Sequence, residues 1–161
     1  MGQDDTPTIE VVRHVLTNLK PLKSEQPEIV VLLQLTSPLR RAKDIDEAVA
    51  KLESSRADSV VSVCAVDHGL QWMMQLHGDR VLPLVGDAQK YVRRQDLPIV
   101  YQMNGAVYVT RTDVIIKQHR LFGEDTRGYI MDAESSIDID TALDMKIASL
   151  LMKERLNERM D

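Results

Sequence analysis

The sequence predicts an α/β domain in which a mainly parallel β-sheet is flanked by helices, a Rossmann-like arrangement. Two short runs of apolar, β-branched residues occupy 28–34 and 59–66, without alternation of apolar and polar residues. Such runs are typical of strands that are buried on both faces of a sheet. The segment between them, 45–52, has apolar residues at helical spacing, so the order favours a βαβ unit. We therefore expect strands and helices to alternate along one domain.

Three other segments have the apolar spacing of helices. Residues 8–19 place five apolar side chains on one helical face, and 112–119 form a shorter helix. The last helix, 141–159, is the longest, and Thr141 with Asp144 resembles a capping box at its start. The chain is thus predicted to begin and end in helices.

The middle of the chain is less regular. We expect short strands at 80–84 and 106–110, and a polar loop that carries Arg93 and Arg94. No internal repeat, low-complexity tract or linker interrupts the sequence, so a single domain of 161 residues is expected.

The composition excludes several classes of protein. The net charge is −5 and aromatic residues make up 4%, which argues against a nucleic-acid-binding surface. One cysteine excludes a disulfide framework and a cysteine-rich zinc site. The polar first residues do not resemble a signal peptide, and no apolar run reaches the length of a membrane span. We expect a cytoplasmic location.

Two aspartates near the last helix form the first candidate site. If Ile137 and Ile139 were buried at the end of a strand, Asp138 and Asp140 would share the opposite face. Two carboxylates so placed can hold a hard cation such as Mg²⁺. The alternative is that Asp140 caps the final helix and Asp138 is solvated.

A second candidate is the loop 34–40, directly after the first predicted strand. Open α/β sheets bind ligands beyond the carboxyl ends of their strands. Gln34 can donate and accept hydrogen bonds, Thr36 and Ser37 carry hydroxyl groups, and Arg40 can pair with an anion. Alternatively, the hydroxyl groups bond the backbone of a simple connecting loop.

A third candidate joins Arg93 and Arg94 to the segment that follows. Adjacent arginines suit a carboxylate or a phosphate, although a solvated loop is the simpler interpretation. The dipeptide Asn104-Gly105 on its own favours a type I′ hairpin turn.

Together these segments resemble the acylneuraminate cytidylyltransferases, the CMP-sialic acid synthetases and their relatives. The resemblance rests on six blocks in the family's order: DDTPTIEVV (4–12), LLQLTSPLR (32–40), DSVVSV (58–63), RQDLP (94–98), NGAVY (104–108) and SIDIDT (136–141). A deoxy-octulosonate cytidylyltransferase shares the fold but fits the blocks at 104–108 and 136–141 less well. The resemblance implies a nucleotide-diphospho-sugar transferase fold and transfer of CMP from CTP to a nine-carbon 2-keto sugar acid, with release of pyrophosphate.

The resemblance also implies roles for particular residues. Asp138 and Asp140 would bind Mg²⁺ against the nucleotide phosphate and the attacking sugar oxygen. The sugar acid would be bound by Gln34, Arg94, Gln102, Asn104, Tyr108 and Phe122. Gln102 stands where many relatives have an arginine that meets the sugar carboxylate.

Members of this family begin with a glycine- and lysine-bearing loop that binds the CTP triphosphate, and no such loop occurs in this sequence. The chain therefore resembles the C-terminal two thirds of the family's fold, and we expect it not to turn over CTP alone. Residues 68–102 would form the family's dimerisation arm, so a homodimer is expected. A non-catalytic, sugar-binding or dimerising remnant of the family is the alternative.

Overall fold

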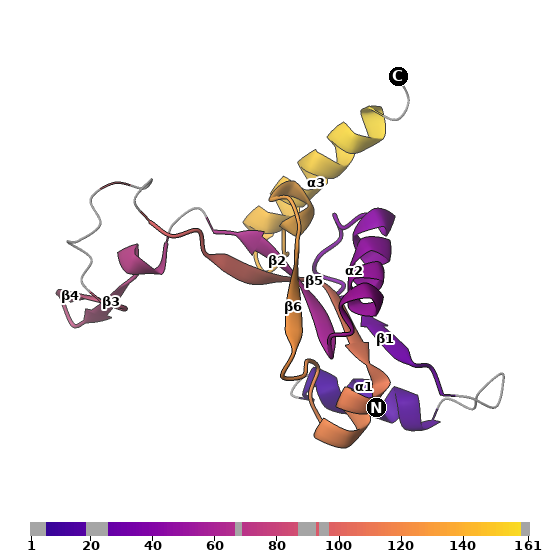
Figure 1. The fold of residues 1–161 in the computed structure, drawn as a ribbon. Coiled ribbons are helices and arrows are strands. Elements are labelled where there is room, and N and C mark those ends of the chain that lie inside the picture. Colours follow the sequence, from indigo (N-terminus) through magenta and orange to yellow (C-terminus); the bar gives the residue numbers. More distant parts are fainter. Residues whose placement is uncertain (1–5, 19–25, 67–68, 87–92, 94–96, 159–161) are drawn as a thin grey trace.

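The computed structural model describes residues 6–18, 26–66, 69–86, 93 and 97–158, and its centre is a four-stranded sheet (Figure 1). The strands lie in the order β1-β5-β2-β6. Their bounds are Ile29–Leu32 for β1, Ser59–Ala65 for β2, Tyr101–Arg111 for β5 and Thr126–Ile130 for β6. Helices and strands alternate along the chain, which confirms the predicted α/β class.

Three of these strands run in one direction. β2 pairs in parallel with β6, whereas β5 lies antiparallel between β1 and β2. The carboxyl ends of β1, β2 and β6 therefore meet at one end of the sheet, here called the carboxyl edge. The opposite end, at Ile29, Ser59 and Thr126, is called the amino edge.

Helix α2 (Ala42–Ser55) connects β1 to β2 and packs on one face of the sheet (Figure 1). Its buried residues Ala48 and Leu52 recur every four positions, which places them on one side of the helix. They form the core with buried side chains of the sheet and its loops: Ala57, Val60, Ala106, Val107, Val109 and Met131. The predicted helix–strand packing is confirmed here.

The long strand β5 is bent by an irregularity in its pairing with β2. Val61 lies opposite Tyr108, but Val63 lies opposite Met103, so β5 has extra residues between these pairs. Gly105 lies within this bulge at φ +72, a conformation that favours glycine. The hairpin turn predicted from Asn104-Gly105 is therefore wrong, because the positive φ of Gly105 occurs in a bulge inside a strand.

Strand β1 is less buried than its apolar sequence predicted. It is an edge strand among the described residues, and Val31 is 37% exposed. The expectation of burial on both faces is wrong for the described part of the chain, because β1 has a sheet neighbour on one side only. The sequence did not reveal this, since a strand's apolar content does not say which neighbours it has.

Helix α1 (Thr8–Asn18) packs against the segment η4 (Val114–Gln118) near the amino edge (Figure 1). The expected short helix at 112–119 is present, and most of it is a π-helical turn. It ends at His119, which has a left-handed backbone (φ 56).

Helix α3 (Ala142–Asn157) begins at the predicted capping box, in which the Thr141 side chain accepts a hydrogen bond from the Asp144 amide. Its apolar residues are nevertheless exposed, with Leu143 at 64% and Leu150 at 61%. Only Ala148 is buried in this helix, which projects from the sheet in Figure 1. No helix in the described part of the chain is long and apolar enough to cross a membrane.

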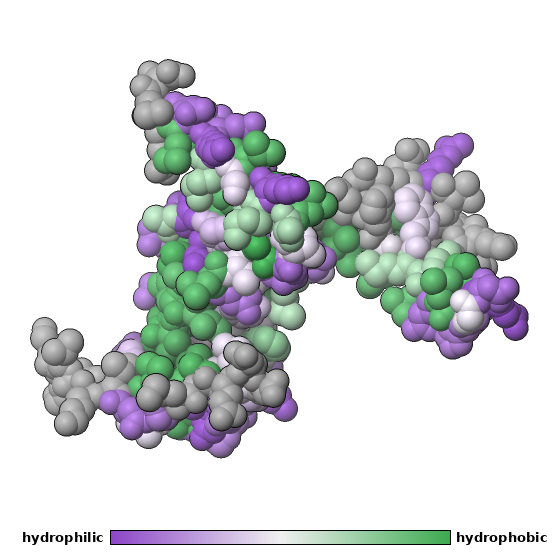
Figure 2. Space-filling view, turned by 180° about the vertical axis from the view of Figure 1, so that it is seen from behind, coloured by the Kyte–Doolittle hydropathy of each residue, from purple (hydrophilic) through white to green (hydrophobic). Residues whose placement is uncertain are grey.

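A two-stranded hairpin extends away from the sheet (Figure 1). It contains β3 (Met74–His77) and β4 (Arg80–Pro83), preceded by a short 3₁₀ turn, η1 (Leu70–Trp72). Figure 2 shows apolar residues on the surface of this projection. They include Leu76 at 73% exposure and Val81 at 58%. A lone hairpin of this kind is marginally stable without further packing.

Candidate functional site

Three loops meet at the carboxyl edge and form the candidate site. The loop 34–40 follows β1, and the segment 137–140 follows the short 3₁₀ turn η5 (Glu134–Ser136). The Ile139 amide donates a hydrogen bond of 2.8 Å to the Thr36 carbonyl and joins the two loops. The bulge of β5 is the third part. Segments far apart in the sequence are thus brought to the edge where open α/β sheets bind ligands.

Asp138 lies half-buried in this junction. The Ser37 hydroxyl, which has no exposed surface, lies 3.4 Å from Asp138 Oδ1 and 3.2 Å from the Asn104 carbonyl oxygen. Burial raises the pKa of Tyr108, and the negative charge of Asp138 raises this pKa further. Tyr108 and Asp138 are therefore close enough to interact electrostatically, as two residues assigned to one site should be.

Gln34 is positioned by the glycine of the β5 bulge. A β-carbon at Gly105 would collide with Gln34 Oε1 and would lie 3.3 Å from Ser37 Oγ. The absence of a side chain at this position allows the Gln34 carboxamide to lie directly against the β5 backbone. Gln34, Gly105 and Ser37 thus form one packed unit.

Asn104 is 4% exposed, and its carboxamide is fully engaged within the protein. Its Oδ1 accepts from the Ser62 hydroxyl (2.5 Å) and from the Ala106 amide (3.3 Å). Its Nδ2 donates to Ser136 Oγ (2.8 Å) and approaches Met131 Sδ at 3.5 Å. These contacts use both acceptor positions and both donors of a carboxamide. Asn104 therefore fixes the bulge to the segment that leads to Asp138.

Asp140 differs from Asp138 in its surroundings. It is exposed, and its backbone amide donates to Asp144 Oδ2 at 3.2 Å. The helix cap is Thr141 rather than Asp140, so the alternative that Asp140 caps the last helix is wrong. Hydrogen bonds from Thr141 hold the pKa of Asp144 below its usual value. The stretch 137–140 is an irregular segment and not the strand end that was expected.

Arg40 has a structural role in the loop. Its Nη1 donates to the carbonyl oxygens of Gln34 (2.6 Å), Ser37 (2.9 Å) and Ala106 (3.3 Å). Burial lowers the pKa of this guanidinium group. The side chain therefore ties the loop to β5, where the sequence suggested an anion-binding group.

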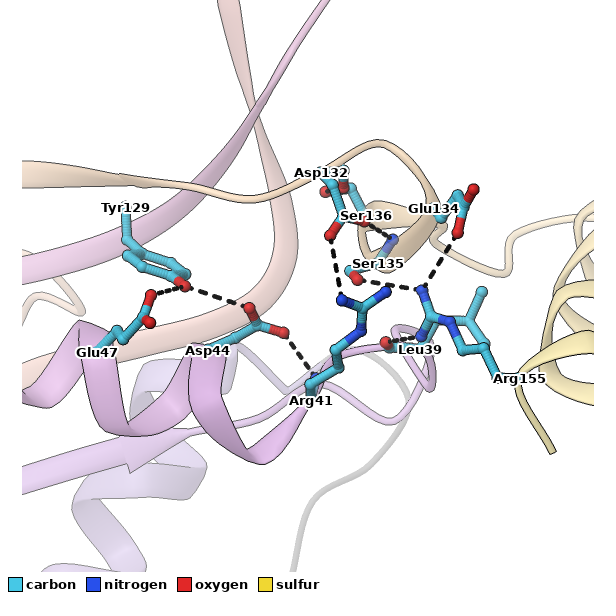
Figure 3. Close-up of polar contacts among 10 residues, drawn as sticks. All are labelled: Leu39, Arg41, Asp44, Glu47, Tyr129, Asp132, Glu134, Ser135, Ser136 and Arg155. Atoms are coloured by element: carbon cyan, nitrogen blue, oxygen red, sulfur yellow. Dashed lines mark hydrogen bonds and ion pairs between the residues drawn. The ribbon is translucent and has the colours of Figure 1, made fainter. Parts of the chain in front are cut away.

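Ionic and polar contacts hold η5 in place, as Figure 3 shows. Arg155 of α3 donates to the Leu39 carbonyl (2.5 Å) and to Ser135 Oγ (3.1 Å). Arg41 lies 3.8 Å from Asp132, whose Oδ1 accepts a 2.7 Å hydrogen bond from the Ser135 amide. The turn before Asp138 is thereby attached both to α3 and to the loop that follows β1.

Next to this cluster, the Tyr129 hydroxyl of β6 lies 2.7 Å from Glu47 Oε2 and 3.2 Å from Asp44 Oδ1 of α2, and its one proton can be donated to either carboxylate (Figure 3). Burial raises the pKa of Tyr129, and both carboxylates raise it further. The phenol therefore stays protonated and fastens β6 to the helix.

The remaining predicted site residues do not join this cluster. Phe122 lies at the amino edge, where it lines a cavity of about 670 Å³ with Pro7 and Ile9. Gln102 is exposed near the carboxyl end of β2, with its Nε2 atom 3.8 Å from Cys64 Sγ. Arg94 lies outside the described residues, and its neighbour Arg93 is exposed.

The sequence did not single out Ser62 or Ser136, which hold the Asn104 side chain. Ser62 had a detectable signal, because it is a polar residue in the middle of an apolar, β-branched run. Ser136 was included only as the first residue of the block SIDIDT (136–141), and no local pattern indicated its contact with Asn104, which is 32 residues away.

Comparison with known proteins agrees with the resemblance seen in the sequence. The chain is 36% identical over 118 residues to an N-acylneuraminate cytidylyltransferase of Streptococcus agalactiae, covering 73% of this chain and 28% of that protein. It is 31% identical over 156 residues to a CMP-N,N'-diacetyllegionaminic acid synthase of Legionella pneumophila, covering 92% and 65%. A post-translational flagellin modification protein B of Campylobacter coli is 24% identical over 156 residues, covering 96% and 66%. No family model matches the sequence.

The fold agrees with these relatives. The solved structure of CMP:2-keto-3-deoxy-manno-octonic acid synthetase complexed with CTP superposes with a TM-score of 0.63 at 14% identity, covering 94% of this chain and 70% of that one. The chain spans 28% to 66% of the length of the three curated relatives named above. By sequence, the chain is a relative of the acylneuraminate cytidylyltransferases, and its fold resembles that of the octonic acid synthetase.

Proposed function

We propose that this chain supplies the sugar-acid-binding part of a CMP-sugar synthetase. The reaction transfers CMP from CTP to a sialic-acid-like nine-carbon 2-keto sugar acid. The anomeric hydroxyl oxygen forms a bond to the α-phosphorus, the bond to pyrophosphate breaks, and the hydroxyl proton is released. The junction of Asp138 with Ser37 and Tyr108 carries the proposal, because it gathers the family-like blocks at the carboxyl edge. Relatives named as synthetases do not favour the non-catalytic alternative.

Asp138 and Asp140 would hold Mg²⁺ in this proposal. Among the residues that the structure describes, no group of three or more His, Cys, Asp or Glu could hold a metal ion. The donor set still fits Mg²⁺, which is commonly bound by one or two carboxylates together with substrate phosphates. Asp138 has one long hydrogen bond, from Ser37, so its carboxylate retains acceptor positions for a cation. The metal would neutralise the charge of the phosphates.

Gln34 and Tyr108 are proposed to contact the sugar acid. Both are half-buried at the carboxyl edge, and Gln34 is fixed against Gly105. On the resemblance alone, we assign Arg94 to the polar groups of the sugar. Gln102 takes the place of the arginine that meets the sugar carboxylate in many relatives. Asn104 would act by holding the site together, since its donors and acceptors are occupied. To contact the sugar acid as the resemblance implies, Phe122 would have to leave the position that it occupies at the amino edge.

The projecting hairpin is proposed to make a homodimer. Its exposed apolar residues, such as Leu76 and Val81, need a partner surface, and a second copy of the hairpin would supply one. We also propose a cytoplasmic location, which the single cysteine led us to expect.

The test is binding of the sugar acid and its dependence on Mg²⁺. Calorimetry with N-acetylneuraminate and N,N'-diacetyllegionaminate should detect binding to the native chain. Asp138→Asn should weaken the Mg²⁺-dependent part of sugar-acid binding about tenfold or more, because a charged ligand of the metal is lost. Asp46→Asn, a change at an exposed aspartate of α2, is the matched control and should bind normally.

Failure of every sugar acid to bind at millimolar concentration would contradict the proposed function. Pyrophosphate release from CTP is measured in parallel with the same sugars. We expect none from the chain alone, and robust turnover would overturn that expectation while supporting the reaction itself.

A further inference from the structure

Ser37 occupies a position that the proposed reaction does not explain. It lies in the loop after β1 and is completely buried, so its hydroxyl cannot contact a substrate. Its amide closes a turn with the Gln34 carbonyl (3.4 Å), and its Oγ faces the Asn104 carbonyl and Asp138 Oδ1. A buried hydroxyl beside a carboxylate has a clear physical use, because it can donate its proton to the charged oxygen.

The backbone around Asp138 is already fixed on one side. The Ile139 amide donates to the Thr36 carbonyl at 2.8 Å, directly next to Ser37 in sequence. On the other side, the Ser136 hydroxyl donates to the Asp132 carbonyl at 2.6 Å and receives the Asn104 amide group. The chain is therefore held at Ile139, directly after Asp138, and at Ser136, two residues before it. The Ser37 hydroxyl lies 3.4 Å from Asp138 Oδ1 and can donate to it, a contact that favours one rotamer of the carboxylate.

We propose that Ser37 is a positioning residue for Asp138: its buried hydroxyl fixes the rotamer of that carboxylate for cation binding. The proposal rests on the metal-binding role given to Asp138 above. The same hydroxyl has a second acceptor, the Asn104 carbonyl, and a single proton serves one acceptor at a time. Ser37 therefore links the β5 bulge and the carboxylate through one side chain.

Two variants separate positioning from general loss of stability. Ser37→Ala removes the hydroxyl and leaves the loop backbone intact. Ser59→Ala is the matched control, because Ser59 is equally buried and its Oγ accepts one hydrogen bond, from the Gly123 amide (3.0 Å). Ser59 lies at the amino edge, where β2 begins, so the loss of its hydroxyl should not affect Asp138.

The first readout is the χ1 angle of Asp138, measured from three-bond NMR couplings without metal. We expect one rotamer in the native chain and in Ser59→Ala, and averaged couplings in Ser37→Ala. The second readout is the affinity for Mn²⁺, followed by paramagnetic broadening of the Asp138 and Ile139 amides. Ser37→Ala should bind Mn²⁺ about three- to tenfold more weakly, the effect of losing one hydrogen bond of ordinary net strength.

Native couplings in Ser37→Ala, with native Mn²⁺ affinity, would overturn the proposal. If the native chain does not bind Mn²⁺, the metal-binding role of Asp138 fails, and the couplings still decide whether Ser37 orders the carboxylate. Should Ser37→Ala fail to fold, Ser37→Cys keeps a weaker donor of similar size and is expected to give intermediate couplings. Fully native couplings and native Mn²⁺ affinity in Ser37→Cys would also contradict the proposal that Ser37 positions Asp138.

Discussion

The two ends of the central sheet use polar side chains in different ways. At the amino edge, side chains bond the backbone of neighbouring segments: Thr110, Ser59 and Asp58 bond the turn 121–125, and Thr112 bonds the Pro27 carbonyl. At the carboxyl edge, the Asn104 and Ser37 side chains join three separate loops around Asp138. The amino edge is thus held by bonds from side chains to backbone, whereas at the carboxyl edge the Ser37 and Asn104 side chains converge on the segment that carries Asp138.

This difference indicates where chemistry can occur. A polar group that is fully used by its own turn has no capacity for a ligand. Asp138 has such capacity, and its charge adds to burial in raising the pKa of Tyr108. We therefore propose that ligands bind at the carboxyl edge, as they do in other open α/β sheets. Substitutions at the two ends should have separable effects.

Asn104→Ala should have the largest effect on stability. The change leaves the Ser62 and Ser136 hydroxyls without their buried partner and opens a space in the bulge. We expect a loss of about 2–4 kcal/mol in the free energy of unfolding. Urea denaturation measures it, with the exposed Asn157→Ala of α3 as a control that should change little. A loss below about 0.5 kcal/mol would contradict the role of Asn104 in joining the β5 bulge to the segment before Asp138.

Glycine substitutions at the two ends form the next test. Gly105→Ala places a β-carbon at positive φ and displaces Gln34, and Gly123→Ala brings a β-carbon to 2.5 Å from Asp58 Cβ. Each should cost about 1–3 kcal/mol. Only Gly105→Ala should also weaken sugar-acid binding in calorimetry, because Gln34 moves. Equal loss of binding in both variants would mean that the ends are not separable.

Phe122→Ala should have a smaller effect. The side chain is 39% exposed at the amino edge, so its truncation should cost about 1 kcal/mol or less. We expect unchanged affinity for the sugar acid, since Phe122 lies at the other end of the sheet from Asp138. A clear loss of affinity would show that Phe122 reaches the site in solution.

The smallest expected effect concerns acid stability. Burial raises the pKa of Asp132, but hydrogen bonds from Ser135 and the charges of Arg41 and Arg155 outweigh it and lower the pKa overall. A folded-state pKa below the unfolded value gives stability that is present above roughly pH 4 and is lost as the pH falls through the folded pKa. Asp132→Asn should therefore flatten the decline of the melting temperature below pH 4. A parallel decline in both proteins would contradict this role.

The sequence predicted the helices and the buried strands because their apolar spacing is a local property. Helix α3 and its Thr141 cap are examples. Its exposed residues, such as Leu143, could not be foreseen, since spacing predicts an apolar surface but not what covers it. Strand β6 was missed because Thr126–Ile130 is a polar edge strand that depends on pairing with β2.

The candidate site was predicted unevenly for a similar reason. Gln34 follows β1 and Tyr108 lies in β5, so the resemblance and the sheet topology agree for these two. Asp138 instead follows the 3₁₀ turn η5. The roles of Asn104 and Ser37 depend on contacts across 32 to 101 residues, which no local pattern contains. The position of Phe122 depends on the turn before β6, which the sequence did not reveal.

The most direct test maps the ligand-binding end of the sheet by NMR. The native chain is titrated with N-acetylneuraminate and then with Mn²⁺, and the backbone amides of both edges are followed. The account predicts shifts and broadening at Gln34 and Asp138, with Phe122 and Gly123 unchanged. Perturbation confined to Phe122 and Gly123, or no perturbation of either edge at millimolar concentrations, would contradict it.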